Sequence, residues 1–303
     1  MGIPPWSDDE RNASTRSRFL PALAARGTFR RCSTHNSHQR RTVSTHRTRR
    51  CPILSSATLS ILLLATVAVA EDDASPAIIE RSASLSTLFP ADRIDALSQI
   101  IAPDRDVQWS LYVPRAQETM GVVVFVKPDR SASPPRGWLK VLDERKLIWV
   151  SAQHFGNSVP VRQRILAGIM GLTYVQQHYP VDPSRVYIAG MSGGGRVASI
   201  AITEFPQLFS GALYIVGVNF WDPQAQARLD QIRRKRYVFL TGNRDFNRDE
   251  TRAVYHRYRE EGVTDSLLMD LPHFGHEYPN AAQFENALRF LDAHHTPAST
   301  SSP

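Results

Sequence analysis

Residues 186–202, VYIAGMSGGGRVASIAI, pass from a short apolar strand pattern to a helical pattern through Gly190-Met191-Ser192-Gly193-Gly194. Glycine is a poor residue for starting a helix, so glycines on both sides of a serine at this junction must serve a geometric need. A G-x-S-x-G turn between a strand and a helix is typical of a nucleophile elbow, where the glycines remove side chains that would collide with neighbouring elements. The segment therefore predicts that Ser192 is a nucleophile at the end of a strand.

A phosphate-binding glycine turn at a helix start is the alternative interpretation. The segment has neither the lysine of a P-loop nor G-x-G-x-x-G spacing, so we favour the elbow. In an elbow, the main-chain N–H of Gly193 would point into the site and donate to a developing oxyanion.

Short apolar runs alternate with amphipathic stretches along the rest of the chain. Strands are predicted at residues 107–113, 120–126, 147–152, 185–189, 212–217, 237–241 and 267–271. Helices are predicted at residues 92–101, 138–145, 161–178, 194–204, 224–234, 249–261 and 280–294. Near-continuous apolar strands indicate a sheet covered on both faces, and the strand–helix alternation indicates parallel crossovers. We expect a doubly wound, mostly parallel α/β sheet with helices on both faces, no large lid, and a site at the carboxyl ends of the strands.

The chain order of an elbow hydrolase places an acid and then a histidine after the serine. Asp245 follows the strand at 237–241 and is the expected acid; Asp249 is the rival, but it begins a predicted helix, where the dipole already favours an acidic residue. His273 and His276 follow the last strand. We favour His276 as the base, because it lies further out on the loop, and expect His273 to pack on the strand end or line the pocket.

A second oxyanion donor is expected from the loop after residues 120–126. This loop reads Lys127-Pro128-Asp129, and proline has no N–H, so the backbone of Lys127 or Asp129 is the candidate. A plain surface loop is the alternative. The candidate pocket residues follow other strands, with core packing as an equal alternative for the two adjacent aromatic residues: Met191, His154, Phe155, Asn219, Phe220 and Trp221.

Residues 107–295 resemble the polyhydroxybutyrate depolymerase and feruloyl esterase-like branch of the α/β-hydrolase family. The resemblance lies in VDPSRVYIAGMSGGGRVAS with Ser192, TGNRDFNR with Asp245 and GHEYP with His276, and in PPRGWLKVLDERKLIWVSA leading to GNS. It implies a serine esterase in which these three residues form the triad.

The basic character of the chain is confined to its N-terminal part. The formal charge is +7, yet residues 1–70 contain 11 arginines and 3 acidic residues, so the remainder carries −1 and gives no basic patch for nucleic acid. Arg49-Arg50 precede an apolar run at 53–70 that ends Ala68-Val69-Ala70, the pattern of a secretory signal peptide. An uncleaved anchor and twin-arginine export are the alternatives.

The chain is therefore expected to have five parts. These are a disordered basic leader or misassigned extension at 1–50, a signal peptide at 51–70, a leader of the mature chain at 71–105, a catalytic domain at 106–295 and a disordered tail at 296–303. Both cysteines, Cys32 and Cys51, lie before the expected cleavage point, so the mature chain is expected to have no disulfide, thiolate metal site or cysteine nucleophile.

We expect an exported protein, periplasmic or secreted, that hydrolyses small or short polymeric carboxylic esters without a cofactor. A zinc site at His273 and His276 is the metal alternative, but no helix motif with a carboxylate and a histidine supports it. Two further interpretations stay open: a serine peptidase or acyltransferase on the same fold, and a non-catalytic exported binding protein. We expect no nucleic-acid partner and no stable membrane insertion once the signal is removed.

Overall fold

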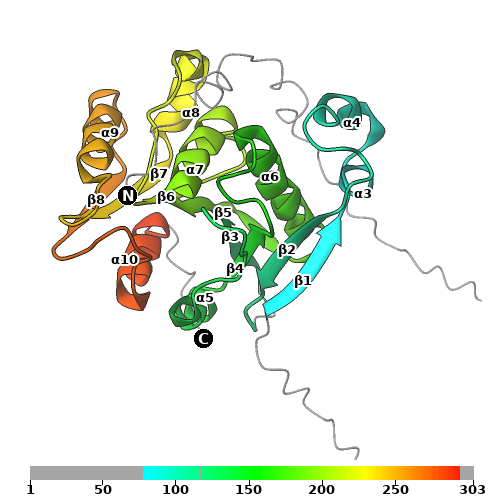
Figure 1. Cartoon of the computed structure of the whole chain (residues 1–303), viewed down its shortest axis with the longest axis horizontal. Helices are drawn as coiled ribbons and strands as arrows, with labels where there is room; N and C mark the ends of the chain where they lie inside the picture. The colour runs from blue at the N-terminus through cyan, green and yellow to red at the C-terminus, as the bar shows by residue number, and fades with distance from the viewer. Residues whose placement is uncertain (1–77, 116–117, 294–303) are drawn as a thin grey trace, which may run out of the picture. The chain divides into compact units, whose positions relative to one another are not determined.

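The computed structural model describes residues 78–115 and 118–293, which are built on one sheet (Figure 1). The strands are β1 (Ile78–Ala83), β2 (Val107–Tyr112), β3 (Met120–Val126), β4 (Leu147–Ala152), β5 (Val181–Met191), β6 (Gly211–Ile215), β7 (Arg236–Gly242) and β8 (Ser266–Leu271). The helices are α3 (Leu85–Leu88), α4 (Ala91–Leu97), α5 (Leu139–Glu144), α6 (Val161–His178), α7 (Gly193–Glu204), α8 (Leu229–Arg233), α9 (Arg248–Glu260) and α10 (Ala281–Leu291). Two 3-10 helices are η2 (Arg136–Trp138) and η3 (Pro223–Arg228).

The eight described strands follow the order β1-β2-β4-β3-β5-β6-β7-β8. The pairs β1–β2 and β2–β4 are antiparallel, and every pair from β4 to β8 is parallel. Helices α5 and α10 lie on one face of the sheet, and α6 and α7 lie on the other (Figure 1). The predicted doubly wound, mostly parallel sheet is confirmed, and it brings the carboxyl ends of β3 to β8 to one edge.

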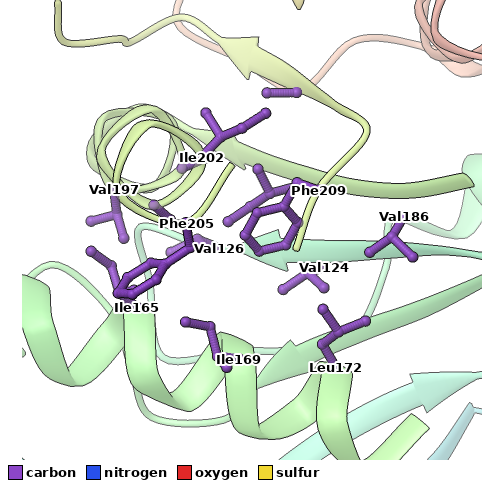
Figure 2. Packing of buried hydrophobic residues seen from close by; sticks show 14 of the residues in the cluster. Val124, Val126, Ile165, Ile169, Leu172, Val186, Val197, Ile202, Phe205 and Phe209 are labelled. Atoms are coloured by element: carbon purple, nitrogen blue, oxygen red, sulfur yellow. The ribbon is translucent and has the colours of Figure 1, made fainter. Parts of the chain in front are cut away.

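The larger core lies between the sheet and the helices α6 and α7. Figure 2 shows side chains of the two helices and of β3 and β5 pointing toward one another, among them Val124, Ile165, Ile169, Val186 and Val197. The helical residues recur at spacings of three and four, which sets them on one face of each helix. This packing fixes α7, and with it the position of the turn that precedes α7.

Residues 78–105 are part of the folded unit, whereas the sequence predicts a leader over residues 71–105. β1 pairs antiparallel with β2 over its whole length, and Leu85, Leu88, Leu97 and Ile101 are buried in the larger core. β1 is an edge strand that reads IIERSA and is mostly exposed, so it lacks the apolar run that marks the buried strands. The helix expected at residues 92–101 corresponds to α4, which is shorter than expected and ends at Leu97.

The start of β5 and the segment between β6 and β7 also differ from expectation. β5 begins four residues earlier than expected, and the single helix expected at 224–234 is divided into η3 and α8. Asp222 caps the start of η3 by accepting from the N–H of Gln224, and Pro223 occupies the first position, where its missing N–H costs nothing. η3 and α8 are the helical elements between β6 and β7, so the described chain contains no large lid there. In this part of the chain, no helix is long and apolar enough to cross a membrane.

A buried ionic cluster fastens the end of α10 to the sheet. Asp292 accepts from Arg185 on β5 at 3.0 Å, from Arg145 at 3.0 Å and from the hydroxyl of Tyr187 at 2.7 Å. Burial raises the pKa of the Asp292 carboxyl, but the hydrogen bonds from Arg185, Tyr187 and Arg145 outweigh it, so the pKa is lowered. The carboxylate is therefore held in its charged form.

Candidate active site

Ser192 forms the sharp turn between β5 and α7. Its φ of 54° and ψ of −123° lie in a region that side-chain-bearing residues rarely adopt, and its N–H donates to the carbonyl oxygen of Ile215 at 2.8 Å. A Cβ at Gly190 would overlap the carbonyl oxygen of Gly194, and a Cβ at Gly194 would overlap that of Val126. The turn is possible only because these two positions carry no side chain, as the motif predicted.

The hydroxyl of Ser192, the imidazole of His276 and the carboxylate of Asp245 form one hydrogen-bonded line. Ser192 Oγ lies 2.8 Å from His276 Nε2, and His276 Nδ1 lies 2.8 Å from Asp245 Oδ1. A carboxylate at Nδ1 favours the proton on that nitrogen, so Nε2 can accept from the serine hydroxyl. Asp249 lies in the first turn of α9, and His273 lies beside Arg244, with their nitrogens 3.3 Å apart.

The carboxylate of Asp245 is buried and is held by Thr241 and Asn247 as well as by His276. The hydroxyl of Thr241, on β7, donates to Oδ2 at 2.8 Å, and the N–H of Asn247 donates to Oδ1 at 3.2 Å. The Asn247 side chain in turn donates to the carbonyl oxygen of Val216, after β6, at 2.8 Å. The carboxylate is therefore fixed in orientation by its neighbours.

Arg164 of α6 is a buried residue that joins two loops and the start of α7. Its guanidinium donates to the main-chain oxygens of Lys127 at 3.0 Å, Phe155 at 3.2 Å and Gly193 at 3.4 Å. The expected oxyanion residues Lys127 and Gly193 are thus bridged by one side chain. Arg164 was not predicted from the sequence; the available signal was a charged residue on the helical face that carries Val161 and Ile165.

The loop after β3 lies against the loop after β4. The N–H of Asn157 donates to the carbonyl oxygen of Pro128 at 2.8 Å, and a Cβ at Gly156 would meet the main-chain oxygens of Pro128 and Asp129. The side-chain amide of Asn157 lies directly over Gly193, where it would overlap an added Cβ. Asn157 was not singled out in the sequence, although GNS at 156–158 was part of the resemblance.

The side chain of Lys127 turns inward rather than into solvent. Its Nζ donates to the carbonyl oxygen of Ser133 at 3.1 Å and lies 5.5 Å from the ring centre of Tyr278. Burial lowers the pKa of the Lys127 ammonium, and burial raises the pKa of the Tyr278 hydroxyl. Tyr278 follows His276 by two residues, so this contact joins the loop of the expected oxyanion donors to the loop of the histidine.

Several of the expected pocket residues have other neighbours. Met191 is buried in the core on the α5 and α10 face, and Phe220 and Trp221 stack on each other and pack against Tyr258 of α9. For the two aromatic residues, these contacts correspond to the core-packing alternative. Asn219 accepts from Arg196 at 3.1 Å.

The loop after β4 holds the remaining two expected pocket residues. Phe155 is buried in the larger core, and its carbonyl oxygen accepts from Arg164. His154 is exposed, with Nδ1 3.5 Å from a guanidinium nitrogen of Arg130. Among the described residues, no group of three or more His, Cys, Asp and Glu side chains is placed to hold a metal ion.

Comparison with known proteins places this geometry in a known fold. A model of the prolyl oligopeptidase family matches residues 168–270, about a third of the chain, which includes Ser192 and Asp245 but ends before His276. In sequence, none of the curated proteins matches the chain.

Solved structures of esterases and related hydrolases share the arrangement. A ferulic acid esterase has a TM-score of 0.54 and 15% identity, covering 72% of this chain and 98% of its own. An S-formylglutathione hydrolase from Staphylococcus aureus has a TM-score of 0.50 and 14% identity, covering 70% and 93%. An ester hydrolase from the metagenome of Lake Arreo has a TM-score of 0.50 and 12% identity, covering 71% and 83%. At these identities the similarity shows the fold, and the chain has the α/β-hydrolase fold.

Proposed function

We propose that the protein is a serine hydrolase that cleaves carboxylic esters through an acyl-enzyme intermediate. The observation that carries the proposal is the line from Ser192 Oγ through His276 to Asp245, with both hydrogen bonds at 2.8 Å and the serine on a strained elbow. A serine hydroxyl is a weak nucleophile unless a positioned base takes its proton, and this arrangement supplies that base.

The reaction follows from the positions of these groups. Ser192 Oγ attacks the ester carbonyl while its proton passes to His276 Nε2, and Asp245 holds the imidazolium that forms. The oxyanion is held by the N–H of Gly193 and a second N–H from Lys127 or Asp129; the bridge through Arg164 favours Lys127. His276 then gives its proton to the departing alcohol. Water, activated by the same imidazole, attacks the acyl-enzyme, and the acid leaves with the serine restored.

A serine peptidase is the second candidate. The observation in its favour is the match of residues 168–270 to the prolyl oligopeptidase family. The same triad can serve either reaction, because the leaving group is chosen by the surrounding loops. Turnover of an ester compared with the anilide of the same acyl group separates the two candidates: hydrolysis of both at similar rates would favour the peptidase.

The direct test is hydrolysis of p-nitrophenyl acetate and butyrate by the full chain, beside Ser192→Ala and labelling with a fluorophosphonate. We expect clear turnover and labelling for the wild type, and a loss of at least about 1,000-fold in kcat for the variant. Ser184→Ala is a matched control, because Ser184 is an exposed serine of β5 that bonds to Asp182. A folded wild type that neither turns over ester nor takes up the probe would instead support the non-catalytic binding protein.

Export is a further part of the proposal. It rests on the sequence of residues 49–70, which lie outside the described residues. Expression of the full chain followed by cell fractionation and intact-mass measurement tests it. We expect an exported protein that begins at Glu71; a mass that includes residue 50 would argue against cleavage there.

A further inference from the structure

Phe246 is a large aromatic residue that is not packed into the hydrophobic core. Its side chain is 68% exposed, and with Ile78 it makes up the exposed large hydrophobic residues of the described chain. Ile78 lies at the start of an edge strand, whereas Phe246 follows the expected catalytic acid directly. Because Phe246 contacts a residue of the candidate site, its exposed ring is in a position to line the site and contact a ligand there.

The ring of Phe246 stacks on the imidazole of His276. The ring centres lie 4.1 Å apart, and the planes are inclined by 21°. With one face on the imidazole and most of the side chain exposed, the opposite face of the phenyl ring is open to a ligand.

The backbone on both sides of Phe246 is held in place. The N–H of Asp245 donates to the carbonyl oxygen of Gly242 at 3.0 Å, and the N–H of Asn247 donates to Asp245 Oδ1 at 3.2 Å. The side chain of Asn247 is tied to Val216, after the neighbouring strand β6. A flat apolar surface on a fixed loop loses little conformational entropy when a ligand contacts it.

The position of this ring relates to one part of the ester. In the proposed reaction, His276 Nε2 gives its proton to the departing alcohol oxygen, so the alcohol portion must pass beside the imidazole. We propose that Phe246 is a specificity-determining residue that binds the alcohol portion of the substrate, and that it selects esters of aromatic alcohols. This inference rests on the proposed esterase function and adds to it the chemical class of the leaving group.

The test compares three acetate esters that give the same acyl-enzyme: benzyl, cyclohexylmethyl and ethyl acetate. Their kcat/KM reports acylation, in which the alcohol leaves, and the two ring-bearing alcohols are similar in size. For Phe246→Ala, we expect the ratio of kcat/KM for benzyl to ethyl acetate to fall by about 3- to 10-fold, which corresponds to an aromatic pair contact. Phe246→Tyr should keep this ratio. Phe246→Leu should lower kcat/KM for benzyl acetate more than kcat/KM for cyclohexylmethyl acetate.

Ile78→Ala is the matched control, because it removes the other exposed apolar side chain at the opposite edge of the sheet. Thermal unfolding of each variant checks that the fold is retained. Equal losses for all three esters in Phe246→Ala would mean that the ring acts only on His276, and would overturn the inference while leaving the esterase in place. A wild type inactive on every ester and unlabelled by a fluorophosphonate would overturn both.

Discussion

Arg164 and Lys127 are joined by a hydrogen bond of 3.0 Å from the guanidinium to the main-chain oxygen, deep between α6 and the end of β3. The same guanidinium reaches Gly193, so the two chain segments expected to hold an oxyanion share one support. The three carbonyls are reached from three different nitrogens of the planar guanidinium, whereas all three donors of an ammonium leave a single nitrogen.

We therefore expect Arg164→Lys to lower kcat by roughly 10-fold or more with little change in KM. The physical reason is that one or two hydrogen bonds from a charged group, each about 1.5–3 kcal/mol, are lost from the loops that must be in place in the transition state. A trifluoromethyl ketone, which forms an oxyanion on the serine, should bind more weakly by the same factor. Steady-state kinetics and inhibition constants measure both quantities.

Arg162→Lys on the same helix is the control for this substitution, and it should leave both quantities within about 2-fold of the wild type. A variant at Arg164 that melts at a lower temperature but keeps its kcat and its inhibitor affinity would show that the arginine supports only the fold.

Thr241 and Thr251 allow a matched test of the hydrogen bond that holds the Asp245 carboxylate. Thr241 donates to Asp245, whereas the buried hydroxyl of Thr251 has no hydrogen-bond partner within the described residues. We expect Thr241→Val to lower kcat/KM by about 10-fold, because a buried carboxylate oxygen loses a bond worth about 1.5–3 kcal/mol. Thr251→Val should leave kcat/KM unchanged and should not lower the free energy of unfolding. Similar activity in the two variants would contradict the role given to Thr241.

The pKa of Asp292 predicts how stability changes in acid. Because the folded pKa is lowered, the stabilisation is present above the unfolded value of about 3.9 and is lost as the pH falls through the folded pKa. We expect urea unfolding to show a free energy that falls below about pH 4 in the wild type. Asp292→Asn should be less stable at pH 7 and should lose part of this slope, leaving the part due to Asp270, whose pKa is also lowered. If the free energy of unfolding falls equally steeply with pH in the two proteins, Asp292 does not contribute to the loss of stability in acid.

The conformation of Ser192 predicts an opposite effect of two small substitutions. A positive φ costs a residue with a Cβ about 1–3 kcal/mol, and glycine adopts it without that cost. We expect Ser192→Gly to unfold at a higher temperature than Ser192→Ala, although both lose the hydroxyl and are inactive. Differential scanning calorimetry on the two variants makes the measurement, and an equal or reversed order would show that the turn is not strained.

Much of the fold could be predicted because its buried strands and long helices carry strong local patterns. The structure reproduces the predicted bounds of β3, β4 and α6 to the residue, since each is an uninterrupted apolar run or a long amphipathic stretch. β1 was missed because an exposed edge strand has neither pattern. Its place depends on the pairing with β2, which is a tertiary contact.

The residues of the site also fall into those that the sequence predicts and those that it does not. Chain order and strand ends predict Ser192, Asp245 and His276, and in the structure His276 lies within hydrogen-bond distance of both Ser192 and Asp245. Arg164, Phe246 and the side chain of Asn157 could not be chosen, because their positions depend on how loops from different strands pack together. Phe220 and Trp221 show the converse: aromatic residues after a strand can pack against a neighbouring helix, where Trp221 is buried and Phe220 is partly buried.

Because the turn at Ser192 is strained, selection for heat resistance and selection for activity favour different residues at this position. A laboratory search for variants that survive heating would favour glycine at this position, since the gain in free energy comes from relieving the backbone. The same search would discard the proposed nucleophile. Engineering for heat resistance should therefore hold residue 192 fixed and look for its gains elsewhere, for example at the buried hydroxyl of Thr251.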